Sequence, residues 1–292
     1  MASSTDHPDL RATLTQRLLL CTDLDRTLLP NGEAQESEGA RTMFARVVAQ
    51  QGLSLAYVSG RHLALIEESI QAYRLPEPDW ILADVGSSIV QRGTQGWSPL
   101  DRWSRHIAAD WRGLTAEDLA VLLSGLPGLT LQPEDRQNTH KLSYFVSLDV
   151  DLPTLMRLIG SRLDERAVAA NLIHSVDEQE AIGLLDILPQ RASKLHAIEF
   201  LMRKLGFHPD QTLFAGDSGN DLSVLTSSLP AVLVANAHPA VVAQATAEAR
   251  TNGTADRLYL ARGGFLGMNG NYSAGILEGM GQFHADSLRE LG

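Results

Sequence analysis

The chain has 292 residues, 44% of them hydrophobic and 20% charged, and its 24 Lys and Arg against 35 Asp and Glu give a net charge of −11. This size allows one large domain or two modest ones. An acidic surface favours neither nucleic acid nor an anionic membrane, so local positive groups must attract an anionic substrate. The single cysteine, Cys21, excludes an intrachain disulfide and lies in an apolar run, where a buried, unreactive thiol is expected.

The chain shows no sign of a targeting or membrane-spanning segment. Residues 1–17 are polar and lack the continuous apolar stretch of a secretory signal. No run of about 18 apolar residues occurs. We therefore expect a cytoplasmic protein that acts on a small molecule rather than on nucleic acid or a membrane.

Short apolar runs alternate with amphipathic stretches in chain order. The runs predict buried strands at Leu18–Thr22, Leu53–Val58, Trp80–Ala83, Leu213–Ala215 and Ala231–Val234. Between several of them lie helical patterns, for example Ala40–Gln50 and Leu195–Leu205. This alternation predicts an α/β fold, a parallel sheet with helices on both faces. Ligands of such sheets bind beyond the carboxyl ends of the strands, so polar residues after the strands are the candidates for function.

The middle of the chain has a different pattern. Leu142–Val150 alternates like a half-exposed strand, and Gly183–Leu188 is a second strand candidate. Leu114–Leu123 and Leu152–Leu163 have the spacing of amphipathic helices. We therefore expect a smaller α+β domain of residues 88–189, inserted into a core of residues 1–87 and 190–292.

Two carboxylates, Asp23 and Asp25, follow the first predicted strand. In extended chain they point to the same side, where they repel each other unless a cation lies between them. A divalent metal is the natural partner. On this motif alone, a solvated acidic loop at the end of a strand is the simpler interpretation.

Two weaker signals lie further along the chain. Ser59-Gly60-Arg61 ends the second predicted strand, and its hydroxyl and backbone N–H groups suit phosphate at the start of a helix, although Ser-Gly is also common in ordinary turns. Lys194 begins the helix that runs to Leu205, where the helix dipole disfavours a lysine. This lysine is either an ordinary solvated side chain or a residue with a functional role.

The segment Gly216–Asp221 carries the strongest signal. Asp217 and Asp221 follow a predicted strand within a glycine-containing turn. A turn explains the glycines, but it explains two more acids only if a metal lies among them. Oxygen ligands suit Mg²⁺, whereas one cysteine and scattered histidines give no zinc-like spacing.

Taken together, the four motifs resemble those of the haloacid dehalogenase superfamily of phosphatases. That superfamily has Asp-x-Asp-x-Thr, Ser/Thr-Gly-Arg, Lys and Gly-Asp-x-x-Asn-Asp in this order, and all four occur here between Asp23 and Asp221. The inserted residues resemble a C2-type cap. Further similarity to the sucrose-phosphatase family lies in His140–Tyr144, Leu188–Lys194, Gly216–Asp221, Asn236–Pro239 and Ala274–Gly279. The resemblance implies a Rossmann-like core with a parallel sheet, helices on both faces and a smaller α+β cap.

The resemblance also implies a role for each matching residue. Asp23 would attack phosphorus and form an aspartyl phosphate, and Asp25 would act first as general acid and then as general base. Mg²⁺ would be held by Asp23, Asp217 and Asp221 and by the backbone carbonyl of Asp25.

The remaining core residues would contact phosphate or orient the loops. Ser59, the Gly60 N–H and Lys194 would stabilise the phosphoryl oxygens. Thr27 and Asn220 would orient the loops that carry the acids. Arg61 would either orient the phosphate site or contact the sugar.

The cap would cover the site and contact the sugar. Its candidate contacts are Lys141, Ser143, Tyr144, Gln190 and Arg191, for which ordinary alternation of polar residues on a cap strand is the alternative. Gly86 and Ser87 are expected at the hinge or at the mouth of the site.

The substrate that the resemblance implies first is sucrose 6-phosphate. Mannosylfructose phosphate, glucosylglycerol phosphate and glucosylglycerate phosphate are the alternatives among phosphatase substrates. A hexose phosphomutase and a non-catalytic protein that binds sugar phosphate are the alternative functions.

Overall fold

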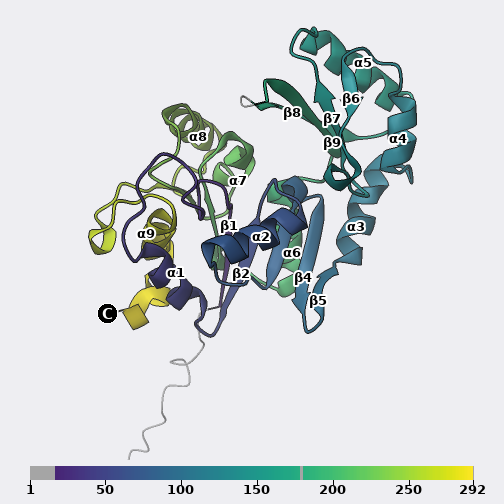
Figure 1. The fold of residues 1–292 in the computed structure, drawn as a ribbon. Coiled ribbons are helices and arrows are strands. Elements are labelled where there is room, and N and C mark those ends of the chain that lie inside the picture. Colours follow the sequence, from purple (N-terminus) through teal and green to yellow (C-terminus); the bar gives the residue numbers. More distant parts are fainter. Residues whose placement is uncertain (1–16, 178–179, 292) are drawn as a thin grey trace, which may run out of the picture.

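The computed structural model describes residues 17–177 and 180–291 (Figure 1). Within these residues the strands form one eight-stranded sheet and one four-stranded sheet. From edge to edge the large sheet contains β12 (Leu258–Leu260), β11 (Ala231–Leu233), β10 (Thr212–Gly216), β1 (Leu18–Thr22), β2 (Leu53–Val58), β3 (Trp80–Ala83), β4 (Ser88–Gly93) and β5 (Gly96–Pro99). The small sheet contains β6 (Leu129–Leu131), β7 (Leu142–Val146), β9 (Ile182–Pro189) and β8 (Ala170–Asp177).

The α-helices cover these sheets. They are α1 (Ala40–Val48), α2 (Leu63–Tyr73), α3 (Asp101–Ala108), α4 (Ala116–Leu122), α5 (Leu152–Asp164), α6 (Lys194–Leu205), α7 (Leu222–Leu225), α8 (Pro239–Asn252) and α9 (Ser273–Phe283). None of the described helices has the length and apolar character needed to cross a bilayer.

The large sheet is parallel from β12 to β3 and is covered on both faces. Alternate residues of β1 separate into two cores, as the period of a strand requires. Leu19 and Cys21 pack with residues of α6 and α7, whereas Leu18 and Leu20 pack with residues of α1, α2 and α9. The predicted α/β class with helices on both faces is therefore confirmed, and so is the burial of Cys21, which raises the pKa of its thiol.

The small sheet is antiparallel and is covered on one face by α4 and α5. Leu142, Tyr144 and Val146 of β7 point into the core beneath these helices. Their neighbours in β7 point to the opposite face, which looks toward the large sheet (Figure 1). We call the small sheet with α4 and α5 (residues 116–189) the cap.

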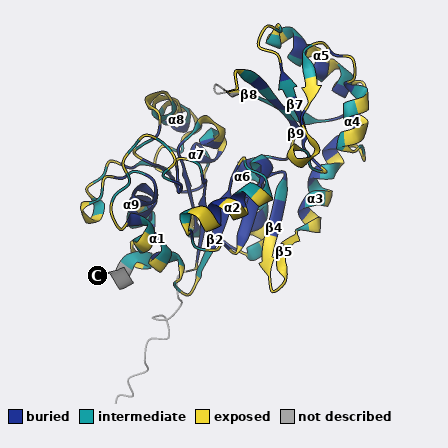
Figure 2. Cartoon of the chain, viewed as in Figure 1, coloured by how far each residue is buried: buried dark blue, intermediate teal, exposed yellow. Residues whose placement is uncertain are grey.

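Two further strands and a helix lie between β3 and the cap. β4 and β5 follow residue 87; β4 pairs antiparallel with β3 and β5 pairs antiparallel with β4, so the two extend the large sheet to its exposed edge at β5 (Figure 2). Helix α3 then leads away from the large sheet toward the cap (Figure 1). The division of the chain into two domains at residues 88 and 189 remains a proposal.

Two histidines meet where α3 packs against α6. His106 Nε2 lies 3.3 Å from His196 Nε2, and both rings contact Trp103. Burial lowers the pKa of His106 and that of His196, and the second ring lowers the pKa of His196 further. The charged groups that face the pair are Asp110, Arg191, Glu199 and Arg203.

This pair predicts a loss of stability in acid. A folded-state pKa below the unfolded value means that the unfolded chain binds more protons, so stability falls as the pH drops below about 6.5. We expect the pair to account for less than about 1 kcal/mol of unfolding free energy, because both rings are partly exposed. Urea unfolding from pH 7.5 to 5 measures it, and His196→Gln should reduce the slope. Parallel curves for the two proteins would contradict the prediction.

Candidate active site

The acidic residues of two motifs meet at the carboxyl edge of the large sheet. β1 and β10 are parallel neighbours, with Thr22 opposite Ala215, and the Asp23 N–H continues the ladder by donating to the Ala215 carbonyl at 2.9 Å. Asp23 therefore leaves β1 beside Asp217, which leaves β10. Carboxylate oxygens of Asp23, Asp217 and Asp221 all lie within 4.8 Å of one another, and all three residues are buried.

Lys194 balances part of this charge. It begins α6, where Ser193 caps the helix by accepting a hydrogen bond from the His196 N–H. Its buried ammonium lies 3.1 Å from Asp23 Oδ1 and donates to Asp221 Oδ1 at 2.7 Å and to Asn220 Oδ1 at 2.9 Å. Burial opposes its charge, but the two carboxylates outweigh burial and raise the pKa of Lys194. The lysine thus stays protonated inside the protein.

One lysine does not neutralise three buried carboxylates. Burial, together with the charge of Asp221, raises the pKa of Asp23 to about 7 even against the ammonium of Lys194. The same two causes raise the pKa of Asp217 to about 6. A hard divalent cation among these oxygens would relieve the repulsion, and a set of carboxylate ligands fits such an ion. The acids are therefore able to hold a divalent metal.

Asp221 differs from the other two acids in its partners. Its Oδ2 accepts from the Asp217 and Ser218 N–H groups and from Ser218 Oγ, each at 3.2 Å, while its Oδ1 accepts from Lys194. Thr27 Oγ1 donates to Asp217 Oδ1 at 3.1 Å and holds that carboxylate in turn. Hydrogen bonds from the protein thus orient both acids of the loop after β10.

The side chain of Asp25 turns away from this group and pairs with Arg61. Arg61 Nε donates to Oδ2 at 2.8 Å and Nη2 donates to Oδ1 at 2.5 Å, while Asn31 Nδ2 also donates to Oδ1. Burial opposes ionisation, but the hydrogen bonds and charge of Arg61 prevail and lower the pKa of Asp25. The side chain of Asp25 is not a member of the triad that can hold a metal.

The loop after β2 supports Arg61. Ser59 is buried, and its Oγ accepts from the Arg61 N–H at 3.1 Å. Gly60 lines the cavity next to Asp23 and Asp25. The structure therefore brings all four sequence motifs to one place.

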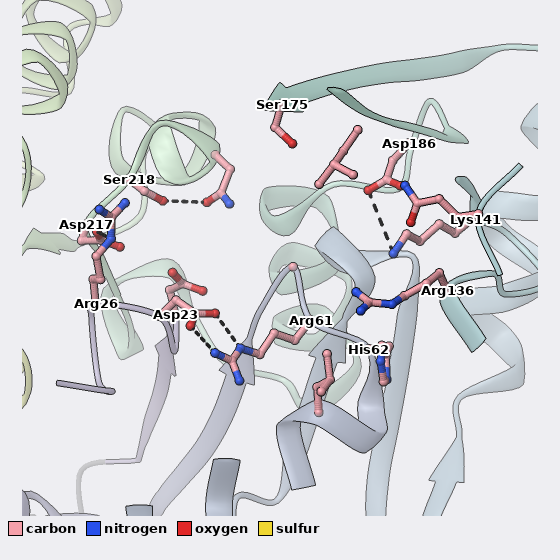
Figure 3. Close-up of a pocket in the computed structure, with 16 residues that line it drawn as sticks. Asp23, Arg26, Arg61, His62, Arg136, Lys141, Ser175, Asp186, Asp217 and Ser218 are labelled. Carbon is pink, nitrogen blue, oxygen red and sulfur yellow. Dashed lines mark hydrogen bonds and ion pairs between the residues drawn. The ribbon is translucent and has the colours of Figure 1, made fainter. Parts of the chain in front are cut away.

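A cavity of about 460 Å³ separates this group from the cap (Figure 3). The core side includes Ser218 and Asn220 of the fourth motif, together with Arg26, His62 and Leu65. The cap side consists of Gln132, Arg136, Lys141, Ser175, Leu184 and Asp186. A ligand between them would touch the acids and the cap at the same time.

Of the sugar contacts expected on the cap, only Lys141 lines this cavity. Ser143 does not line the cavity itself but contacts a residue that does, because its Oγ donates to Asp186 Oδ1 at 2.5 Å. Tyr144 is buried in the cap core on the other face of the small sheet, so the expected contact is not present in this structure. The period of a strand explains the difference, because neighbours in β7 point to opposite faces.

The other expected contacts lie at the connection between core and cap. Arg191 pairs with Asp110, and Gln190 also lies outside the cavity lining. The Gly86 carbonyl accepts from Trp103 Nε1, and Ser87 Oγ accepts from Asn138 Nδ2 at 3.2 Å. Gly86 and Ser87 thus contact the segments between core and cap and do not line the cavity; that this is a hinge stays a prediction.

Sequence reasoning missed several residues of the lining. They are Arg26, His62, Leu65, Gln132, Arg136, Ser175, Leu184, Asp186 and Ser218. For those on the cap strands, the register of the small sheet was the missing information: Ser143 is opposite Asp186, and Ser175 is opposite Leu184, so these residues share the open face.

Comparison with known proteins agrees with this arrangement. Residues 16–284 match the family described as sucrose-6F-phosphate phosphohydrolase. The chain belongs to the sucrose-6F-phosphate phosphohydrolase family. This membership confirms the resemblance drawn from the sequence and makes the chain a phosphatase of the haloacid dehalogenase superfamily.

Individual known proteins resemble the chain over most of its length. A HAD-like hydrolase from Nitrosococcus oceani is 48% identical over 274 residues, which are 94% of this chain and 74% of that protein. Sucrose-phosphatase 2 from Nicotiana tabacum is 32% identical over 82% of this chain, which spans only 55% of that protein. The sucrose-phosphatase from Synechocystis sp. PCC6803, whose structure contains sucrose and phosphate, has a TM-score of 0.67 and 26% identity, with 92% of this chain and 98% of that chain covered.

Proposed function

We propose that the chain is a Mg²⁺-dependent phosphatase that removes phosphate from a sugar phosphate through an aspartyl phosphate on Asp23. The observation that carries the proposal is the buried ammonium of Lys194, 3.1 Å from Asp23 Oδ1, within a group of three carboxylates that faces a cavity. A protein that only binds sugar phosphate has no need of a buried lysine beside an acid that can attack phosphorus. The cytoplasm is the proposed location.

In the first step Asp23 would attack phosphorus while the ester oxygen leaves with a proton from Asp25. The new bond joins Asp23 to phosphorus, and the bond that breaks joins phosphorus to the sugar oxygen. In the second step a water molecule would attack phosphorus and give its proton to Asp25. This step releases Asp23 and inorganic phosphate, so one difficult displacement becomes two easier ones.

Asp25 would have to separate from Arg61 to serve as the acid. Arg61 already lines the cavity and holds both carboxylate oxygens of Asp25, and a phosphate dianion is a stronger partner for a guanidinium than one carboxylate. Arrival of the phosphate would therefore draw Arg61 away and free Asp25 to take up a proton. Ser59, the Gly60 N–H and Lys194 would stabilise the other phosphoryl oxygens.

Asp23 and Asp217 would hold Mg²⁺, with Asp221 acting directly or through water, and the Asp25 carbonyl as a further ligand. The ion would supply charge stabilisation for the phosphoryl oxygens and screen the attacking carboxylate from the phosphate. Carboxylate oxygens as the ligand set favour Mg²⁺ over zinc.

Metal removal should abolish activity. We expect EDTA-treated enzyme to release phosphate at less than about 1% of the untreated rate and Mg²⁺ to restore it, because charge stabilisation of this kind is worth several kcal/mol. Asp217→Asn should raise the Mg²⁺ concentration that gives half-maximal rate. Full activity of the EDTA-treated protein, verified as metal-free by elemental analysis, would refute the role given to Asp217.

We propose sucrose 6-phosphate as the first candidate substrate. The alternatives are mannosylfructose phosphate, glucosylglycerol phosphate and glucosylglycerate phosphate. They stay open because the core motifs would contact only the phosphate group, so the cap would have to recognise the rest of the substrate. A phosphate-release screen across these compounds, with and without Mg²⁺, tests the proposal. Conversion to an isomer without phosphate release would instead indicate a phosphomutase, and no reaction with any compound would indicate a binding protein.

A further inference from the structure

Asp84 links the core to the cap at the edge of the cavity. It follows β3 in the core, and its Oδ1 lies 3.0 Å from Nζ of Lys141 in the cap. Its Oδ2 accepts from Nδ2 of Asn138, also in the cap, at 2.9 Å. The Asp84 and Lys141 side chains are only 8% and 10% exposed, so the pair is shielded from solvent. Both oxygens of one core carboxylate are therefore occupied by the cap.

The two cap donors, Asn138 and Lys141, belong to one turn that is closed by backbone hydrogen bonds. The backbone N–H of Asn138 donates to the carbonyl of Lys141, and the N–H of Lys141 donates back to the carbonyl of Asn138, each at 3.2 Å. The side chains of this turn cannot move independently, because the reciprocal bonds fix its backbone. The pair Asp84–Lys141 thus holds the turn as a unit.

On the core side, Asp84 is tied to the phosphate loop. Its N–H donates to the Arg61 carbonyl and the Val85 N–H donates to the Ser59 carbonyl, both at 3.0 Å. Asp84 has φ 51° and Val85 has φ 58°, a region that residues other than glycine rarely adopt. Such a conformation persists where the surroundings impose it, and it is frequent at functional sites. Asp84 therefore stands between the loop expected to bind phosphate and the cap turn.

Lys141 joins the contact between Asp84 and the cap turn to the cavity, which it lines. Besides its contact with Asp84, its ammonium lies 4.0 Å from Asp186 Oδ2, and both Lys141 and Asp186 line the cavity (Figure 3). An ammonium has three N–H donors, so pairing with Asp84 leaves donors for a ligand. Asp186 is held in turn by Ser143.

We propose that Asp84 is a positioning residue that sets the distance between the phosphate loop and the sugar-reading face of the cap, by holding Lys141 against the cavity. The inference rests on the proposed phosphatase function. A polyhydroxyl leaving group spans this distance, so its turnover depends on Asp84. A small aromatic leaving group without hydroxyls does not reach the cap and does not need it.

The test compares wild type with Asp84→Asn on sucrose 6-phosphate, or on the best sugar phosphate of the screen, and on p-nitrophenyl phosphate. Asparagine keeps the size of aspartate and tolerates a positive φ, so the fold should persist. We expect kcat/KM to fall roughly 30-fold for the sugar phosphate but less than about threefold for p-nitrophenyl phosphate, as for misplacement of a bound group. Asp210→Asn, which breaks the exposed Asp210–Arg257 pair, is the matched control and should change neither value.

Two further variants separate positioning from a general structural effect. Adding Asp84→Asn to Lys141→Met should cause no further loss, because Asp84 acts through Lys141. Asn138→Ala removes the other cap donor to Asp84 and should also lower kcat/KM more for the sugar phosphate than for p-nitrophenyl phosphate. This variant replaces Asp84→Asn in the test if Asp84→Asn does not fold.

The outcomes distinguish this inference from the function on which it rests. The inference would be overturned if Asp84→Asn left the ratio of the two kcat/KM values unchanged, whether by equal losses for both substrates or by no loss at all. It would also be overturned if the losses from Asp84→Asn and Lys141→Met multiplied in the double variant. In either case the phosphatase activity itself would stand. A wild-type enzyme that hydrolyses no sugar phosphate would overturn the proposed function and this inference together.

Discussion

Replacing Asp23 with asparagine is expected to abolish turnover while leaving the fold intact. The variant keeps the shape of the side chain but removes the oxygen nucleophile, and loss of a nucleophile lowers kcat on the order of 10⁴-fold or more. Stability should change little, because Lys194 retains its contact with Asp221 at 2.7 Å. Phosphate release under saturating substrate measures the first effect, and thermal unfolding measures the second.

The control for this variant is Asp79→Asn, which changes a carboxylate at the opposite end of the sheet. Asp79 precedes β3, its Oδ2 accepts from the Leu55 N–H of β2, and it does not line the cavity. Its activity should stay near that of wild type. If Asp23→Asn also keeps near-wild-type kcat, the attack on phosphorus must come from another group.

Lys194→Met should lower both activity and stability. Methionine fills the space of the lysine but leaves the carboxylates of Asp23 and Asp221 without their buried cation. Breaking a buried ion pair from one side lowers the free energy of unfolding by about 3–5 kcal/mol. Loss of a donor to the phosphoryl oxygens should lower kcat on the order of 10²–10³-fold.

Magnesium separates the two effects of this variant. Because a divalent cation neutralises the same carboxylates, it should restore part of the lost unfolding temperature without restoring kcat. Lys204→Met, on the exposed side of the same helix, is the matched control and should affect neither quantity strongly. A Lys194→Met protein as stable as wild type without metal would contradict the charge balance described for the site.

The sequence predicted the core of the fold because its strands are buried on both faces. A parallel strand covered by helices consists of continuous apolar residues, as in Leu18–Thr22, and such runs are conspicuous. β4, β5, β6 and β8 carry no such run: β4 ends in the exposed residues Gln91–Gly93, and most of β5 is exposed. Pairing with neighbours rather than local pattern decides these strands.

Some residues of the site could likewise be predicted from local sequence, whereas others depend on how the sheets and helices pack. Asp23, Asp217 and Lys194 were predictable, because the carboxyl ends of parallel strands and the start of the helix that leads into β10 share one edge of the sheet. Residues of the cap depend on which face of the small sheet is covered by helices. That choice buries Tyr144 and turns Asp186 toward the cavity, and the sequence of β7 or β9 alone does not state it.

The contacts between core and cap were the least predictable part. Asp84 and Lys141 are 57 residues apart, one just after a strand of the large sheet and the other just before a strand of the small sheet, so no periodicity relates them. The positive φ of Asp84 is likewise invisible in the sequence, since aspartate adopts many conformations. Only the tertiary arrangement places the pair together.

Trapping the phosphorylated enzyme tests the central claim most directly. Asp25→Asn should form the intermediate readily from p-nitrophenyl phosphate, whose leaving group needs no acid, and should hydrolyse it slowly for lack of a base. After acid quench, mass spectrometry of the digested protein should find the phosphoryl group on Asp23. Release of p-nitrophenol by this variant with no phosphoryl group on the enzyme, or with the group on another residue, would contradict the account.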